Sequence, residues 1–139
     1  MDVKNKRVVV TGAASGIGKA LCEAFHQAGA QSIVAVDMNI EGAQETADSV
    51  NGIAIQANVG KEEDIINVIE KANEHAGGID IFCSNAGIGG VPGFFEVSAA
   101  DWQNIWDVNV QGHIFAAKHV LPQMIERGEG YLVNTSSAA

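Results

Sequence analysis

Short apolar runs alternate with segments of helical periodicity along this chain. Five-residue runs rich in Val and Ile occupy residues 7–11, 32–36, 53–57, 80–84 and 131–135. Continuous apolar runs of this length are typical of strands that are buried on both faces of a parallel sheet. We therefore predict five parallel strands, joined by the longer segments between them.

The segments between these runs predict helices. Residues 17–28 and 65–76 place their apolar side chains on one helical face, whereas residues 40–50 do so more weakly. Alternating strands and helices favour right-handed βαβ units. The expected fold class is α/β, a Rossmann-like doubly wound parallel sheet with three layers (α/β/α).

The longest predicted helix spans about residues 99–127. Ser98, followed three residues later by Asp101, gives it a capping-box start. Its apolar side chains, among them Trp102, Trp106 and Phe115, cover more than one stripe. Such a helix packs against the sheet and against a second surface, and we expect that surface to be another subunit of a homo-oligomer.

Length and charge narrow the classes of function. The 139 residues suit one domain, residues 1–139, and 8 Lys and Arg against 17 Asp and Glu give a net charge of −9. That charge argues against nucleic acid as a partner. No apolar run approaches the length of a membrane span. Two cysteines and four histidines show no metal-ligand or disulfide spacing, so we expect a metal-free cytoplasmic protein.

A glycine-rich turn follows the first predicted strand. Residues Thr11–Gly18 read TGAASGIG, a G-x-x-x-G-x-G pattern that opens the first predicted helix. Glycines permit a tight turn and let a pyrophosphate approach the backbone, while the helix N-terminus supplies free N–H groups. The strand–turn–helix context predicts a dinucleotide site at this position.

Asp37 stands directly after the second predicted strand, 19 residues beyond Gly18. An acidic side chain at this point accepts hydrogen bonds from the adenosine ribose hydroxyls and repels a 2′-phosphate. The neighbours Ser15 and Met38 offer no positive charge to bind such a phosphate. NAD is therefore the expected cofactor, in preference to NADP.

Several further motifs follow in order, and with them the chain resembles the first half of the short-chain dehydrogenase/reductase family. Thr11–Gly18 matches the family's T-G-x-x-x-G-I-G motif, and Ser84–Gly87 matches its N-N-A-G motif with Ser in place of the first Asn. Val108–Gly112 matches V-N-x-x-G, and Val133–Ser137 matches the fifth-strand motif. Asn58-Val59 stands where the family usually has Asp-Val next to the adenine.

The resemblance implies roles for individual residues. Ser137 is the expected catalytic serine, which hydrogen-bonds the reacting oxygen, and Asn109 is the expected holder of a water in a proton relay. The expected substrate is a small secondary alcohol or ketone. The expected cofactor-binding residues are Gly12, Ser15, Gly16, Ile17, Gly18, Asp37, Met38, Asn58, Val59, Asn85, Ala86 and Gly87.

The family's acid–base motif, Tyr-x-x-x-Lys, is not found in these residues. The one tyrosine, Tyr131, is followed four residues later by Thr135 and precedes Ser137. We expect the motif beyond residue 139, with the fold incomplete at its C-terminal end after the fifth strand and no turnover by this chain alone. A non-catalytic NAD-binding module and a structural fragment are the alternatives. Dimers and tetramers, common in the family, are the expected assemblies.

Overall fold

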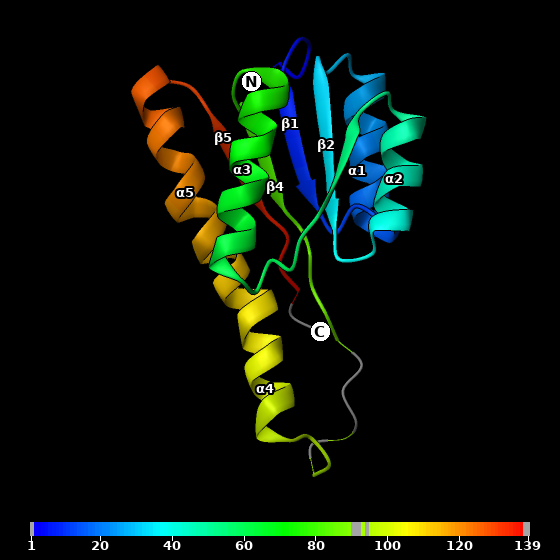
Figure 1. Ribbon diagram of the computed structural model, residues 1–139, viewed down its shortest axis with the longest axis vertical. Helices are drawn as coiled ribbons and strands as arrows, with labels where there is room; N and C mark the ends of the chain where they lie inside the picture. Colours follow the sequence, from blue (N-terminus) through cyan, green and yellow to red (C-terminus); the bar gives the residue numbers. More distant parts are fainter. Residues whose placement is uncertain (1, 90–92, 94, 138–139) are drawn as a thin grey trace.

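A single five-stranded parallel sheet organises the structure, a computed structural model that describes residues 2–89, 93 and 95–137 (Figure 1). The strand order is β3-β2-β1-β4-β5, with every neighbouring pair parallel. The strands are β1 (Arg7–Thr11), β2 (Ser32–Asp37), β3 (Ile53–Gln56), β4 (Ile81–Ser84) and β5 (Tyr131–Asn134). The predicted Rossmann-like sheet is confirmed, and each observed strand lies within one residue of its predicted bounds.

Helices cover both faces of this sheet. They are α1 (Gly16–Gln27), α2 (Ile40–Ser49), α3 (Glu62–Ala76), α4 (Ala99–Trp106) and α5 (Gly112–Arg127). On one face, side chains of α3 and α5 join strand residues such as Val9 and Phe82 in one apolar core. On the other face, side chains of α1 and α2 pack with Val8 and Val10. Alternate residues of β1 thus point into different cores, as a strand buried on both faces requires.

The long predicted helix is not one uniform α-helix. Residues Asp107–Gln111 form a π-helical segment, η1, between α4 and α5. The predicted capping box is present, with Ser98 and Asp101 bonded to each other's backbone N–H. Periodicity did not reveal η1, because one extra residue in a turn leaves the period of the apolar pattern on either side unchanged and shifts only its phase. Such π-bulges are frequent at functional sites, and Asn109 lies at the centre of this one.

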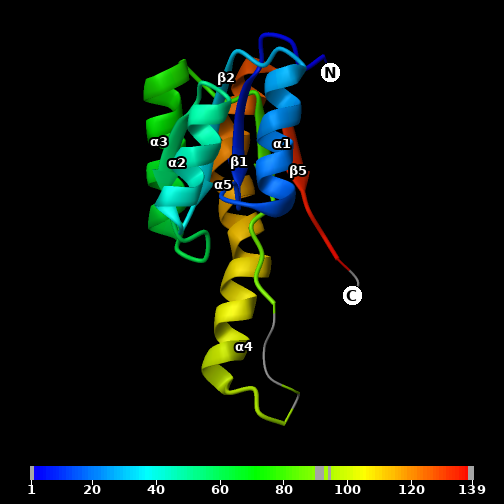
Figure 2. The same cartoon turned by 90° about the vertical axis from the view of Figure 1, so that its right-hand side faces the viewer.

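Helix α4 projects beyond the carboxyl ends of the strands, away from the sheet (Figures 1 and 2). Its tryptophans Trp102 and Trp106 are each 53% exposed. The inner face of the following helix is buried at Gly112, Ala116, Val120 and Met124. The second apolar stripe predicted for this region is therefore real, and the described residues leave it on the surface.

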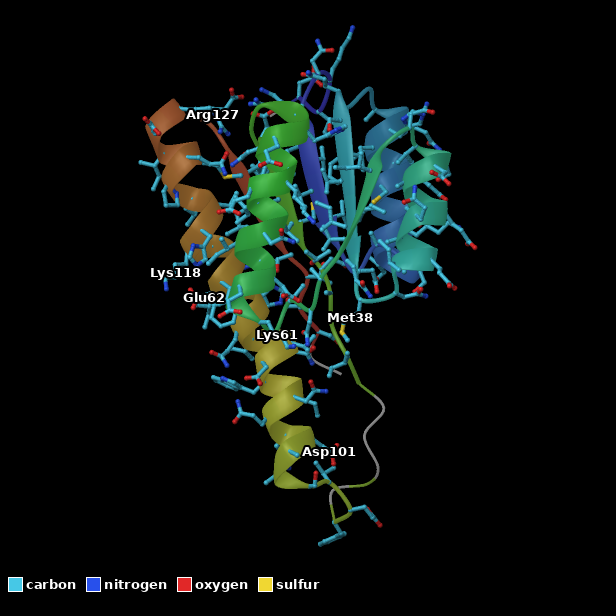
Figure 3. The ribbon with its side chains drawn as sticks, in the orientation of Figure 1. Met38, Lys61, Glu62, Asp101, Lys118 and Arg127 are labelled. Atoms are coloured by element: carbon cyan, nitrogen blue, oxygen red, sulfur yellow. The ribbon has the colours of Figure 1, made fainter. Side chains whose placement is uncertain are left out.

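An ion network ties α3 to α5. Glu62, at the start of α3, accepts hydrogen bonds at 2.7 Å from Lys118 Nζ and, where the ring carries the proton, from His119 Nε2. Figure 3 shows Glu62 and Lys118 pointing toward each other. These two bonds hold the pKa of Glu62 below its usual value.

In the described part of the chain, no helix is long and apolar enough to cross a membrane.

Candidate active site at the carboxyl edge of the sheet

The turn after β1 brings the backbone of three segments into close contact. Gly12 has a φ of +71°, and a Cβ there would lie 2.9 Å from the Cα of Ala86. A Cβ on Gly18 would lie only 2.0 Å from the carbonyl oxygen of Gly12. The turn is therefore sandwiched between the end of β4 and the first turn of α1, and only glycine fits at these positions.

The N-terminus of α1 is open. Ser15 is the N-cap residue, but its side chain makes no capping hydrogen bond. The first intrahelical bond runs from Lys19 N to Ser15 O at 3.2 Å. The N–H groups of Gly16, Ile17 and Gly18 precede that bond, so this terminus keeps the unpaired donors that bind an anion.

Asp37 ends β2 beside this turn. Its Oδ2 accepts from the N–H of Ala14 at 3.0 Å, and its Oδ1 accepts from the N–H of Asn39 at 2.9 Å. The carboxylate is thus fixed against the glycine-rich turn. Each oxygen has a second lone pair, so the half-buried group can still accept hydrogen bonds from a ligand. Met38 follows, 60% exposed, at the edge of the sheet that lies away from Arg127 (Figure 3).

A cavity of about 210 Å³ collects much of the predicted cofactor set. Asn58 contributes a side chain whose Oδ1 accepts from Gly60 N at 2.9 Å, which leaves the Nδ2 group to donate. Ala57, Ile88 and Val108 belong to the lining but were not predicted. The predicted residues that line this cavity are Gly12, Asp37, Met38, Asn58, Val59, Ala86 and Gly87. Residues 15–18 lie outside it, at the start of α1.

Asn85 connects β1, β4 and the segment after β5. Its Nδ2 donates to the carbonyl of Thr11 at 3.0 Å, and its Oδ1 accepts from Thr135 Oγ1 at 2.9 Å. The buried hydroxyl of Thr11 in turn accepts from the N–H groups of Asn85 and Ala86 at 2.9 and 3.0 Å. Thr11 and Thr135 therefore organise the site, although the sequence marked them only as members of motifs.

Both polar groups of the Asn109 side-chain amide are hydrogen-bonded to the loop after β4. Its Oδ1 accepts from Ile88 N and its Nδ2 donates to Ile88 O, both at 2.8 Å. Asn109 and Ser137 line a second open cavity of about 760 Å³. Asn85, Ala86 and Gly87 line it too, and Ala86, Gly87 and Ile88 also line the first cavity. The two cavities therefore meet at the end of β4.

His113 is a site residue that the sequence did not indicate. It stands on α5, lines the second cavity, and holds its Nδ1 2.7 Å from Ser84 Oγ. Burial lowers the pKa of this imidazole. The sequence offered no signal, because the contact joins residues 29 positions apart.

Among the described residues, no group of three or more His, Cys, Asp and Glu side chains is arranged to hold a metal ion.

Residues 6–139 match the family model for short chain dehydrogenases. The chain belongs to the short-chain dehydrogenase family. This family comprises oxidoreductases that generally use nicotinamide cofactors, act on small molecules and often oligomerise. The predicted resemblance is confirmed, and the two cavities lie where a sheet of this kind binds its ligands.

Three short-chain dehydrogenase relatives illustrate the likeness. Glucose 1-dehydrogenase 2 of Bacillus subtilis is 36% identical over 98% of this chain and 55% of its own length. An uncharacterized oxidoreductase of Staphylococcus aureus is 34% identical over 96% of this chain and 58% of its own length. A short-chain type dehydrogenase/reductase from Mycobacterium marinum has a TM-score of 0.91 and 29% identity over 98% of this chain and 57% of its own. The chain spans somewhat more than half the length of these relatives.

Proposed function

We propose that this chain forms the NAD(H)-binding part of an oxidoreductase that transfers hydride between nicotinamide and a secondary alcohol or ketone. One observation carries the proposal. Gly12, Asp37 and Asn58, chosen from sequence for three different parts of the cofactor, line one cavity at the carboxyl edge of the sheet. Open α/β sheets bind dinucleotides at this edge, beside the first crossover.

The residues at this edge fit the dinucleotide. The uncapped N-terminus of α1, from Ser15 to Gly18, offers N–H groups and a favourable dipole to the pyrophosphate. Asp37 would accept the ribose hydroxyls. Asn58 would donate from Nδ2 to the adenine, with the apolar side chain of Met38 beside the ring. Asn85, Ala86 and Gly87 would border the nicotinamide ribose, where the two cavities meet.

The residues with proposed catalytic roles, Ser137 and Asn109, both line the second cavity. When bound, the nicotinamide accepts or supplies the hydride. Ser137 would hydrogen-bond the substrate oxygen and stabilise the charge that develops on it. Asn109 would fix the wall of the cavity through Ile88, and it would hold a relay water. A proton must move together with the hydride, and the 139 residues contain no Tyr-x-x-x-Lys motif to move it.

Fluorescence titration of the chain with NADH and with NADPH tests the cofactor assignment. We expect tighter binding of NADH, because the Asp37 carboxylate repels a 2′-phosphate. The variant Asp37→Asn keeps the side-chain shape and removes the charge, so it should reduce the ratio of NADH affinity to NADPH affinity. Glu45→Gln removes the same charge from an exposed position on α2 and should leave this ratio unchanged. Absence of binding at millimolar NADH, or tighter binding of NADPH, would reject the proposal.

We also propose a homo-oligomer in the cytoplasm. The exposed tryptophans of α4 supply an apolar surface of the kind that oligomers bury. Cys22 and Cys83 are both free and buried, as suits a reducing compartment. The excess of acidic side chains disfavours nucleic acid as a partner.

A further inference from the structure

Three polar side chains line the second cavity from the segment after β4, from η1 and from α5. Two of them are amides, Asn85 and Asn109, and each has a hydrogen-bond partner at both of its ends. The third is His113, whose Nδ1 meets Ser84 Oγ at 2.7 Å. Among the described residues, no hydrogen bond occupies its Nε2. His113 therefore carries an uncommitted polar atom, whereas Asn85 and Asn109, which line the same cavity, are already engaged.

The environment of Ser84 fixes which nitrogen of His113 carries the proton. Ser84 ends β4 and is 4% exposed, so its hydroxyl hydrogen needs a partner inside the protein. Within the described structure, the His113 ring is the only partner of that hydroxyl. A hydroxyl that donates to Nδ1 satisfies both groups, whereas a ring that donates from Nδ1 leaves the hydroxyl hydrogen buried and unpaired. The favoured tautomer carries its hydrogen on Nε2.

Burial also favours the neutral ring, since it lowers the pKa of His113. A neutral ring that is protonated at Nε2 can donate a hydrogen bond from that atom and cannot accept one there. It is therefore not a general base toward the cavity. It is a donor, held in orientation by a buried serine, and it requires an oxygen or nitrogen acceptor on the molecule that occupies the cavity.

We propose that His113 is a specificity-determining residue that donates from Nε2 to an oxygen of the substrate other than the reacting one. This inference rests on the proposed function, in which Ser137 serves the reacting oxygen from the β5 side of the cavity. His113 enters from α5, beside the end of β4. The substrate class is then an alcohol or ketone with a second oxygen function, such as an α-hydroxyketone or a vicinal diol.

The tautomer is measurable without turnover. Long-range proton–nitrogen NMR of the ¹⁵N-labelled chain resolves the four imidazoles, and the His113→Gln variant assigns the signal of interest. We expect an Nε2–H ring at neutral pH. Ser84→Ala removes the hydroxyl donor and should shift the ring toward a mixture of tautomers. A ring protonated at Nδ1, or a ring that Ser84→Ala leaves unchanged, would overturn the proposal.

A matched pair of ketones tests recognition. Hydroxyacetone and 2-butanone have the same size and differ by a hydroxyl in place of a methyl group. Each is titrated into the parent chain and every variant at saturating NAD⁺, and binding is followed through the backbone amide signals of the residues that line the second cavity. Hydroxyacetone should bind roughly fivefold more weakly to His113→Leu than to the parent chain, the loss of one neutral hydrogen bond, with 2-butanone unaffected. His113→Gln, which keeps a donor, should recover part of the difference.

His75→Leu changes an exposed histidine of α3 in the same way and should alter neither titration. Equal losses for the two ketones would show a structural role for His113, and no response to either ketone would also overturn the inference. NADH fluorescence is recorded separately for every variant. Failure of the cofactor to bind therefore counts against the proposed function, whereas bound cofactor without a His113-dependent preference counts against this inference alone.

Discussion

The side-chain amide of Asn109 grips the backbone of Ile88 from both sides, accepting from its N–H and donating to its carbonyl at 2.8 Å each. The two residues lie 21 positions apart, one in the π-helical segment η1 and the other in the loop after β4. Ile88 lines both cavities. Asn109 thus holds in place the residue that lies between the proposed cofactor cavity and the proposed substrate cavity.

Asn109→Asp is expected to weaken this wall. A carboxylate can still accept from Ile88 N–H, but it cannot donate, and it faces the carbonyl oxygen with a negative charge. We expect a loss of about 0.5–1.5 kcal/mol in the free energy of unfolding, together with weaker NADH binding. Urea denaturation and fluorescence titration measure the two effects. Asn104→Asp adds the same charge at an exposed position of α4; equal effects from both variants would refute the role of the amide.

Gly18→Ala separates helix propensity from close packing. Alanine in place of glycine favours a helix by about 1 kcal/mol, so propensity alone predicts a more stable protein. The added Cβ would instead lie 2.0 Å from the carbonyl oxygen of Gly12. We expect net destabilisation and displacement of the turn, measured by thermal unfolding and NADH affinity.

Gly16→Ala is the matched comparison for the same turn. No atom lies within 4 Å of its Cβ position, but its φ is +52°. This variant therefore reports only the left-handed backbone, a cost of about 1–2 kcal/mol. Gly18→Ala should be the more damaging of the two. A Gly18→Ala variant as stable as the parent chain would contradict the close approach of α1 to the turn.

The sheet was predictable because local signals agree with tertiary structure there. Runs such as Val8–Val10 are apolar on both strand faces, and the structure buries both faces in two different cores. The cofactor edge was predictable for a related reason. The carboxyl ends of parallel strands meet at one edge, so Gly12, Asp37 and Asn85 had to converge there once the strand order was given.

The features that could not be predicted all depend on contacts distant in sequence. The π-helical segment changes the hydrogen-bond register around Asn109 and leaves the period of the apolar pattern unchanged on either side. The His113–Ser84 contact needs both the position of α5 over β4 and a buried hydroxyl. From the sequence alone, His113 is one of four histidines and stands in a predicted helix with no sign of a partner. Its partner became visible only when the two elements were packed together.

The exposed tryptophans of α4 predict self-association. Trp102 and Trp106 lie one turn apart, and with Ile105 and Val110 they line an apolar hollow on the surface. Trp106→Glu places a charge in that hollow and should shift the protein toward monomer in sedimentation velocity. Ile40→Glu introduces the same charge on α2 and should not. A parent chain that stays monomeric at all accessible concentrations would refute the interface.

The two cysteines should be inert in the folded chain. Burial raises the pKa of Cys22 to about 12, and burial raises that of Cys83 to about 11. Thiolate is the reactive form, so an aromatic disulfide reagent at pH 8 should react with neither thiol until the protein unfolds. The reaction should therefore follow the unfolding transition in urea. Fast stoichiometric labelling of the native chain would contradict the burial of these side chains.

Asp80 predicts how stability depends on pH. It lies directly before β4, its side chain is 9% exposed, and Nη2 of Arg127, which Figure 3 labels, is 3.6 Å from its Oδ1. Arg7 donates to it from Nε at 2.8 Å, from Nη2 at 2.6 Å and from the backbone N–H at 2.9 Å. The Arg7 side chain, as the main cause, lowers the pKa of Asp80 from 3.8 to about 2.

A depressed pKa in the folded state means that the carboxylate stabilises the fold fully above the unfolded pKa of 3.8 and loses that effect as the pH falls toward 2. The shift corresponds to about 2 kcal/mol. Asp80→Asn should lose about that much at pH 7 and flatten the dependence of unfolding free energy on pH between 4 and 2. Urea denaturation at several pH values measures this. Asp48→Asn, exposed on α2, is the control, and a parallel loss in both variants would show that the ion pair contributes nothing specific.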